Sequence, residues 1–338
     1  MKKLLAIALL VMASSVARAQ APTPTGLVVG SGNFFSPIVS DLDKAIAFYR
    51  DGLGLDIQGT PANADQNAPL RNMFGLPDAQ LRWTVARPPA MRTGVEIVEI
   101  KKAEGTAAQR RLQDPGAFTL IVLVRDVDAA FAKLKQAGAP IVTAGGQPIA
   151  IGRAKRFVAM DPDGHFIEVA QVNPPPPTQA PDTANVVSVS VRVTVDDAAQ
   201  ALRLYQTLGL SGAMNVTYDK NDAMMRLFGL KEDAQFRLAT MEVPTSGLKV
   251  GFIEFKGVDR RTVHANIQDP GSTRMQIQVR DVNATIDALK AAGGTVVSTG
   301  GSTVELPGRG GATTKVAIVR DPNNLFLVLL QAAPPRTP

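Results

Sequence analysis

An internal duplication constrains this chain more than any other feature of its sequence. The segment from Asp41 to Tyr49 recurs from Asp197 to Tyr205. The other recurring segments keep the same order at an offset of about 155 residues: 71–76 recurs as 225–230, 112–116 as 267–271, and 124–127 as 279–282. Because a fixed period over a whole chain marks a repeated structural unit, we expect the two halves to fold in the same way.

The start of the second half shows the local structure of this unit. Valines alternate with polar residues over positions 187–195, which predicts a strand with one face toward solvent. Asp196 or Asp197 can then cap a helix whose apolar residues recur at helical spacing. Gly209 is expected to end this helix. The sequence therefore predicts a strand followed by a helix.

The later part of the first half repeats this order and adds a hairpin. Residues 118–124 predict a strand, and Asp126 can cap a helix after it. Residues 157–172 predict two strands around a turn at 161–164. Each half is thus predicted to contain the order βαβββ twice. We expect an α+β protein of four tandem βαβββ modules.

Residues 1–19 have the layout of a secretory signal peptide. Lys2 and Lys3 precede an apolar run at 4–12, and small residues end at Ala19, where we expect cleavage. The run is shorter than the roughly 20 apolar residues that a membrane span needs. We therefore expect an exported protein, either periplasmic or secreted.

Proline-rich segments set the remaining boundaries. Four consecutive prolines at 174–177 exclude helix and strand and favour an extended connector. The predicted parts are an N-terminal linker at 20–32, a first domain at 33–172, a Pro-rich linker at 173–185, a second domain at 186–332 and a tail at 333–338.

Charge and cysteine content exclude several classes of protein. The net charge of +6 falls to +3 once Lys2, Lys3 and Arg18 leave with the signal peptide, and the remaining basic residues are scattered among acidic ones. This pattern does not predict a nucleic-acid surface. No later segment is apolar enough to span a membrane, so we expect no membrane partner after cleavage. The chain has no cysteine, and its core alone must therefore hold it.

The repeated motifs resemble those of the vicinal oxygen chelate superfamily, the glyoxalase, bleomycin resistance protein and dioxygenase type. They are the aspartate-led helix start at 41–49, its copy at 197–205, and the Asp-Pro turns at 161–164 and 321–324 before the last strands. The resemblance covers both predicted domains. It implies two glyoxalase-like domains whose sheets curl into incomplete barrels around a ligand cleft. Two copies in one chain can complete this cleft, so a monomer is expected to suffice.

Members of this superfamily that carry out chemistry usually hold a divalent metal with His, Gln and Glu side chains from four strands of the cleft. Matching those strands to this sequence gives eight positions: Phe34, Glu96, Thr119, Glu168, Ser190, Gly251, Arg274 and Val328. None of them is a histidine. Each pairing of the two copies offers one carboxylate, whereas a catalytic metal needs about three protein ligands. We therefore expect no metal and no other cofactor, with a divalent metal as the alternative.

Several of these positions are candidates for ligand binding or catalysis. Glu168 is either a general base or a relic of the superfamily's carboxylate. Arg274 either grips a ligand or neutralises Glu96. Gln276 shares the face of Arg274, and Arg192 shares that of Ser190. The predicted ligand cleft is therefore Phe34, Glu96, Thr119, Ser190, Arg192, Arg274 and Gln276.

The two histidines are the remaining acid–base candidates. The side chain of His165 has the parity opposite to that of Glu168, and His264 lies in a polar connection. Both are therefore expected at the surface. These observations predict an exported protein that binds a small organic ligand without a catalytic metal.

An enzyme is the alternative, either a lyase or isomerase or a ring-cleaving dioxygenase of the same superfamily. It would use a sparse metal site or Glu168 as a base. A scaffold for partner proteins is a third possibility that rests on the Pro-rich segments alone.

Overall fold

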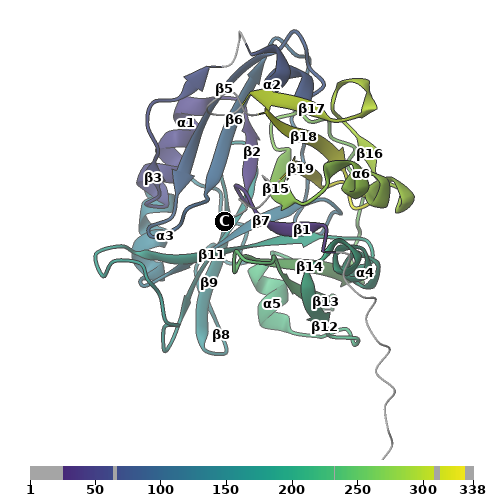
Figure 1. The fold of residues 1–338 in the computed structure, drawn as a ribbon. Coiled ribbons are helices and arrows are strands. Elements are labelled where there is room, and N and C mark those ends of the chain that lie inside the picture. The colour runs from purple at the N-terminus through teal and green to yellow at the C-terminus, as the bar shows by residue number, and fades with distance from the viewer. Residues whose placement is uncertain (1–25, 64–66, 232, 308–312, 332–338) are drawn as a thin grey trace, which may run out of the picture.

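The computed structural model describes residues 26–63, 67–231, 233–307 and 313–331. The predicted signal peptide and the tail at 333–338 lie outside these residues. The α+β fold predicted from the sequence is confirmed, because two large sheets carry short helices on their outer faces (Figure 1). No helix in the described ranges has the length and apolar character needed to cross a bilayer.

The first sheet combines strands from the two ends of the chain. It has 11 strands, and its main path runs β16-β18-β19-β15-β2-β6-β5-β3. The bounds along this path are β16 (Thr295–Val296), β18 (Thr313–Arg320), β19 (Phe326–Gln331), β15 (Thr273–Val279), β2 (Ser36–Val39), β6 (Val95–Lys101), β5 (Gln80–Arg87) and β3 (Asp56–Ile57). Three further strands pair at its sides: β1 (Val28–Ser31), β17 (Val304–Pro307) and β4 (Ala62–Asn63).

The second sheet is built from the middle of the chain. Its eight strands run in the order β12-β13-β14-β11-β7-β10-β9-β8. Their bounds are β12 (Ser211–Met214), β13 (Gln235–Glu242), β14 (Lys249–Lys256), β11 (Val186–Thr194), β7 (Phe118–Val124), β10 (Phe166–Val172), β9 (Ala154–Met160) and β8 (Ile149–Ile151). The Pro-rich linker at 173–185 joins β10 to β11 without a helix or strand.

Each sheet therefore joins modules from both halves of the sequence. In the first sheet β2 pairs antiparallel with β15, and in the second β7 pairs antiparallel with β11. Figure 1 shows the purple and blue strands of the first module beside the yellow-green strands of the last. The boundaries 33–172 and 186–332 describe the repeat in the sequence, whereas the sheets pair module one with module four and module two with module three.

The helices begin where capping aspartates were predicted. Asp41, Asp126, Asp197 and Asp281 each accept hydrogen bonds from the first backbone N–H groups of a helix, which otherwise lack partners. These helices are α1 (Leu42–Ala47), continued by η1 (Phe48–Gly52), and α3 (Val127–Gln136), α4 (Ala198–Leu208) and α6 (Val282–Ala291). Three short helices lie in the connections: α2 (Ala68–Met73), α5 (Asp222–Leu227) and η2 (Thr299–Gly301).

The prediction of an N-terminal linker at 20–32 is wrong at its C-terminal end. Residues Val28–Ser31 form β1, which pairs antiparallel with β15. Val28 is buried and Leu27 packs against the core, so apolar burial decides the structure of this segment. Residues 20–25 of the predicted linker lie outside the described part of the chain.

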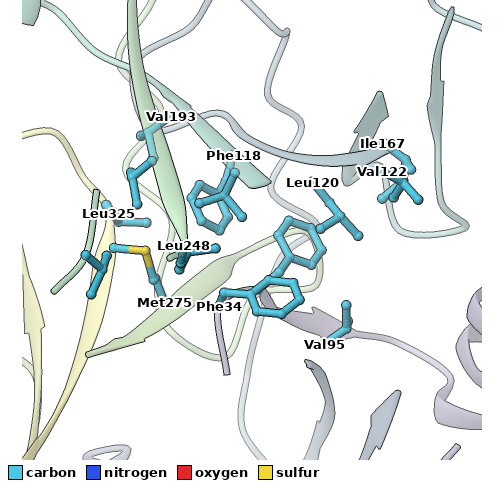
Figure 2. Close-up of a cluster of buried hydrophobic side chains, with 14 of the residues drawn as sticks. Phe34, Val95, Phe118, Leu120, Val122, Ile167, Val193, Leu248, Met275 and Leu325 are labelled. Carbon is cyan, nitrogen blue, oxygen red and sulfur yellow. The ribbon is translucent and has the colours of Figure 1, made fainter. Parts of the chain in front are cut away.

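Large apolar side chains fill the space between the sheets. Figure 2 shows Phe34 and Val95 of the first sheet region close to Phe118 and Leu120 of β7. Phe35 stacks on Phe118 with ring centroids 5.3 Å apart. Because this core takes side chains from both sheets, it holds the two sheets together.

Candidate functional site

A pocket of about 240 Å³ opens on the first sheet, between β5, β6, β15 and β19, with α2 and β17 at its sides. Its walls are mostly apolar. The first module supplies Leu70, Met73, Phe74, Leu81, Trp83 and Val98, and the last supplies Leu306, Val328 and Leu330. The polar lining residues are Glu96, Arg274 and Gln276. Few polar groups in an apolar cavity are typical of a small-molecule site.

Glu96 of β6 is the centre of the polar group. Its Oε2 accepts hydrogen bonds from Arg274 Nη2 at 3.1 Å and from Gln276 Nε2 at 2.8 Å. Ser36 Oγ donates a third, longer bond of 3.5 Å to the same oxygen. The Arg274 side chain is only 1% exposed and that of Glu96 is 17% exposed, so the ion pair is largely shielded from water. Of the two roles predicted for Arg274, the structure shows the pairing with Glu96.

Burial and charge act in opposite directions on Arg274. Burial lowers the pKa of its guanidinium from the ordinary value, while the carboxylate of Glu96 raises it in part. The guanidinium also lies over the ring of Phe74, 4.6 Å from the ring centroid. The arginine is therefore held between a carboxylate and an aromatic face.

The repeated Phe-Gly-Leu motif explains how Phe74 reaches this position. Phe74 caps the C-terminus of α2, and Gly75 follows with a φ of 68°. A Cβ on Gly75 would lie 2.4 Å from the carbonyl oxygen of Val297, in the other half of the chain. Glycine is thus required both by the backbone conformation and by the close approach. In the second copy a Cβ on Gly229 would likewise lie 2.6 Å from the carbonyl oxygen of Val142.

The second sheet carries a related cluster at the equivalent place. Glu168 of β10 is fully buried, and Arg156 Nη1 donates to its Oε1 at 2.9 Å. Arg192 of β11 forms an ion pair with the other carboxylate oxygen at 2.8 Å. The Arg192 guanidinium lies 4.8 Å from the centroid of the Phe228 ring, as Arg274 lies over Phe74. Two arginines and one carboxylate leave this cluster with an excess positive charge.

The structure separates the predicted cleft residues into two groups. Glu96, Arg274 and Gln276 meet in the pocket of the first sheet. Thr119, Arg192 and Glu168 meet in the second sheet, where Thr119 pairs with Arg192 across β7 and β11. Val328 lines the pocket, whereas Gly251 pairs with Arg192 on β14.

Phe34 and Ser190 do not occupy the cleft positions predicted for the first strand of each copy. Strand pairing places Ser36 opposite Arg274 and Arg192 opposite Thr119, so the register differs from the prediction by two residues. Phe34 is fully buried in the core between the sheets, and Ser190 is half-buried opposite Ile121. The prediction failed because counting from the helix cap does not fix how a strand pairs.

We expect Phe34→Leu to lower stability and to leave binding in the pocket unchanged. The loss of ring volume from a fully buried side chain costs about 1–2 kcal/mol. Chemical denaturation measures this cost, and ligand titration measures the affinity. A loss of affinity without a loss of stability would instead indicate that Phe34 contacts the ligand.

Sequence reasoning missed most of the apolar wall. Trp83 and Val98 share a face of β5 and β6 with Glu96, and alternation along β6 from Glu96 would have identified Val98. Phe74 belongs to the Phe-Gly-Leu motif that recurs at 228–230, and the repeat alone does not indicate that its ring faces a pocket. Leu306 comes from β17, which pairs with β18, and it reaches the pocket because the last module packs beside the first.

The expectation that His165 is a surface residue is wrong. His165 is buried between the two halves, where its Nδ1 lies 2.8 Å from Asp161 Oδ2 and its Nε2 lies 3.1 Å from the carbonyl oxygen of Ser272. Tyr49 donates to the same carboxylate at 3.0 Å. His264 is exposed, as expected.

Electrostatics couple the groups of this network. Burial alone would lower the pKa of His165, but the carboxylate of Asp161 raises it above its ordinary value. Burial would raise the pKa of Asp161, and the charge and hydrogen bonds of His165 lower it. Burial and the same carboxylate raise the pKa of Tyr49 well above its usual range. The network is therefore a buried ion pair with a tyrosine donor.

The fold and the pocket define a class of protein: paired βαβββ modules whose open sheets carry a pocket on one face. Residues 33–169 match the model of the Glyoxalase/Bleomycin resistance protein/Dioxygenase superfamily. This part of the chain is therefore similar to that superfamily, and the second half has a similar order of elements.

Comparison with solved structures supports the same fold. Glyoxalase I from Zea mays is 17% identical with a TM-score of 0.58, and the alignment covers 89% of this chain and 93% of that chain. A putative dioxygenase from Bacillus subtilis is 11% identical with a TM-score of 0.52, over 91% of this chain and 86% of that chain. No curated protein matches the chain. At these identities the likeness concerns the fold.

The residues at the superfamily's metal positions do not fit a divalent cation. In the first sheet the carboxylate of Glu96 is paired with a guanidinium, and the neighbouring positions are Ser36, Arg274 and Val328. In the second sheet both oxygens of Glu168 face arginines. Within the described residues no three His, Cys, Asp or Glu side chains form a group that could hold a metal ion. A cation would have to displace a buried arginine in either place.

Proposed function

We propose that this chain is an exported protein that binds a small organic ligand in the pocket of the first sheet, without a catalytic metal. The observation that carries the proposal is the pocket itself, an apolar cavity with one polar group formed by Glu96, Arg274 and Gln276. Its position between module one and module four supports a binding site shared by the two halves. The basic and apolar segments at 1–19 support export.

The surroundings of Glu168 support binding over catalysis at that residue. A general base must reach a substrate proton directly or through one water molecule. Glu168 has no exposed surface, and both carboxylate oxygens face guanidinium groups. These contacts favour a structural carboxylate over a base, and they weigh against an enzyme that uses Glu168.

Trp83 provides the measurement that tests the proposal. It is the only tryptophan of the chain and it lines the pocket, so its fluorescence reports on that site. We expect small single-ring compounds to change the Trp83 emission in a saturable way. Native mass spectrometry of the same preparation, made without added metal or chelator, should show protein without a stoichiometric divalent metal.

The repeat offers a matched control for this experiment. Trp83 pairs with Val98, and at the same place in the second sheet Leu238 pairs with Ile253. Trp83→Leu should abolish the fluorescence change, while calorimetry still detects binding. Saturable binding with unchanged Trp83 emission would place the ligand elsewhere, and a stoichiometric metal would contradict the metal-free site.

A further inference from the structure

The polar group of the pocket offers an unused acceptor on Glu96 and unused donors on Arg274. Glu96 Oε2 takes all the hydrogen bonds that this side chain accepts, so within the described part of the chain its Oε1 accepts none. Arg274 donates only through Nη2 to Glu96, so its Nη1 and its buried Nε donate to no described residue. Both residues line the pocket. A ligand here meets a hydrogen-bond acceptor beside a donor.

The same group carries no net charge, because Glu96 and Arg274 neutralise each other. An anionic ligand would compete with Glu96 for the guanidinium, and a cationic ligand would compete with Arg274 for the carboxylate. Either one would leave a charge without its partner, and the Arg274 side chain is only 1% exposed. A buried charge without a partner is strongly unfavourable. An uncharged ligand leaves the ion pair intact.

The size and the walls of the pocket limit the rest of the ligand. A dry cavity of roughly 150 Å³ accommodates benzene, and this pocket has about 240 Å³. The volume therefore suits one substituted ring. Trp83, Phe74 and Leu81 supply apolar and aromatic surface against which such a ring can pack.

We propose that the pocket selects uncharged single-ring compounds that carry a hydrogen-bond donor next to an acceptor, as a primary carboxamide does. The amide N–H donates to Glu96 Oε1, and the amide carbonyl accepts from the guanidinium of Arg274. This inference rests on the proposed function and adds the chemical class of the ligand. It assigns Glu96 and Arg274 as the residues that determine specificity.

Four single-ring compounds that differ in charge and hydrogen bonding test the inference: benzamide, benzoate, benzylamine as its ammonium ion, and toluene. Their affinities are measured by Trp83 fluorescence and by calorimetry at neutral pH. We expect benzamide to bind at least tenfold more tightly than each of the other three. Equal or tighter binding of benzoate, benzylammonium or toluene overturns the specificity but leaves a working small-molecule pocket. The absence of binding by all four contradicts the proposed function as well.

A conservative substitution tests the charge argument separately. Glu96→Gln keeps the shape of the side chain and leaves Arg274 without its carboxylate, so an anion becomes favoured. We expect the ratio of the benzoate Kd to the benzamide Kd to fall at least tenfold. Glu305→Gln removes the same charge from an exposed position on β17, outside the pocket lining, and should leave the ratio unchanged. An unchanged ratio in Glu96→Gln would overturn the assignment.

Discussion

Replacing Glu168 with valine is expected to lower the free energy of unfolding by about 3–5 kcal/mol. Glu168 is fully buried and is the shared counter-ion of Arg156 and Arg192, with N–O distances of 2.9 and 2.8 Å. Its removal leaves the buried Arg192 without any anion, and the Arg192 side chain is only 6% exposed. Valine is the natural choice because Val328 stands at the equivalent place on β19. Urea denaturation measures the loss.

An exposed carboxylate provides the control for this substitution. Glu305→Val makes the same chemical change on the surface of β17 and should alter stability by less than about 0.5 kcal/mol. If Glu168→Val cost no more than this control, Glu168 would not be the counter-ion of the two arginines. Its burial would then need another explanation.

Replacing His165 with leucine is expected to cost about 3 kcal/mol at pH 6 and to change how stability depends on pH. The folded pKa of His165 is raised, so its contribution is complete below the unfolded value of about 6.5 and is lost as pH rises through the folded pKa. The folded pKa of Asp161 is lowered, so its contribution is present above about 3.9 and is lost as pH falls through the folded pKa. Denaturation curves between pH 5 and pH 9 measure the contribution of His165, and curves below pH 4 measure that of Asp161.

The second half of the chain already contains the arrangement that His165→Leu would create, an aspartate and a tyrosine without a histidine. Asp321 occupies the place of Asp161 and accepts from Tyr205, but Leu325 stands where His165 does, and burial raises the pKa of Asp321. In His165→Leu we therefore expect the decline of stability above neutral pH to disappear. His264→Leu removes an exposed histidine and should keep the wild-type curve. Parallel curves for wild type and His165→Leu would contradict the ion pair.

The local part of the fold was predictable because it depends on short-range rules. Aspartate caps such as Asp126 and Asp281 satisfy backbone N–H groups that neighbour them in sequence, so the motif alone indicates where a helix begins. Alternating residues likewise indicate a strand. The pairing of modules is not local, since the contact between β2 and β15 joins residues more than 200 positions apart. Nothing in the periodicity of either strand identifies its partner.

The candidate site was predictable to the same extent. Glu96 and Arg274 were identified as cleft residues, and their pairing had been considered. Phe34 and His165 were misplaced, because register and burial depend on tertiary packing that sequence parity does not contain. The pairing of Ser36 with Arg274, which decides the first strand's position in the site, could be read only from the structure.

Because each sheet contains strands from both halves, the two halves depend on being joined in one chain. Cutting the chain within the Pro-rich linker at 173–185 would free two fragments, each with exposed edges where β2, β7, β11 and β15 had been paired. Neither fragment would contain all the strands of either sheet. The duplicated gene product thus behaves like a dimer whose subunits have been tethered end to end, and the tether keeps both copies at equal concentration and in each other's reach. Within this one chain the two sheets carry sites of different charge: the neutral pair of Glu96 and Arg274 in the first, and an excess of positive charge around Glu168 in the second.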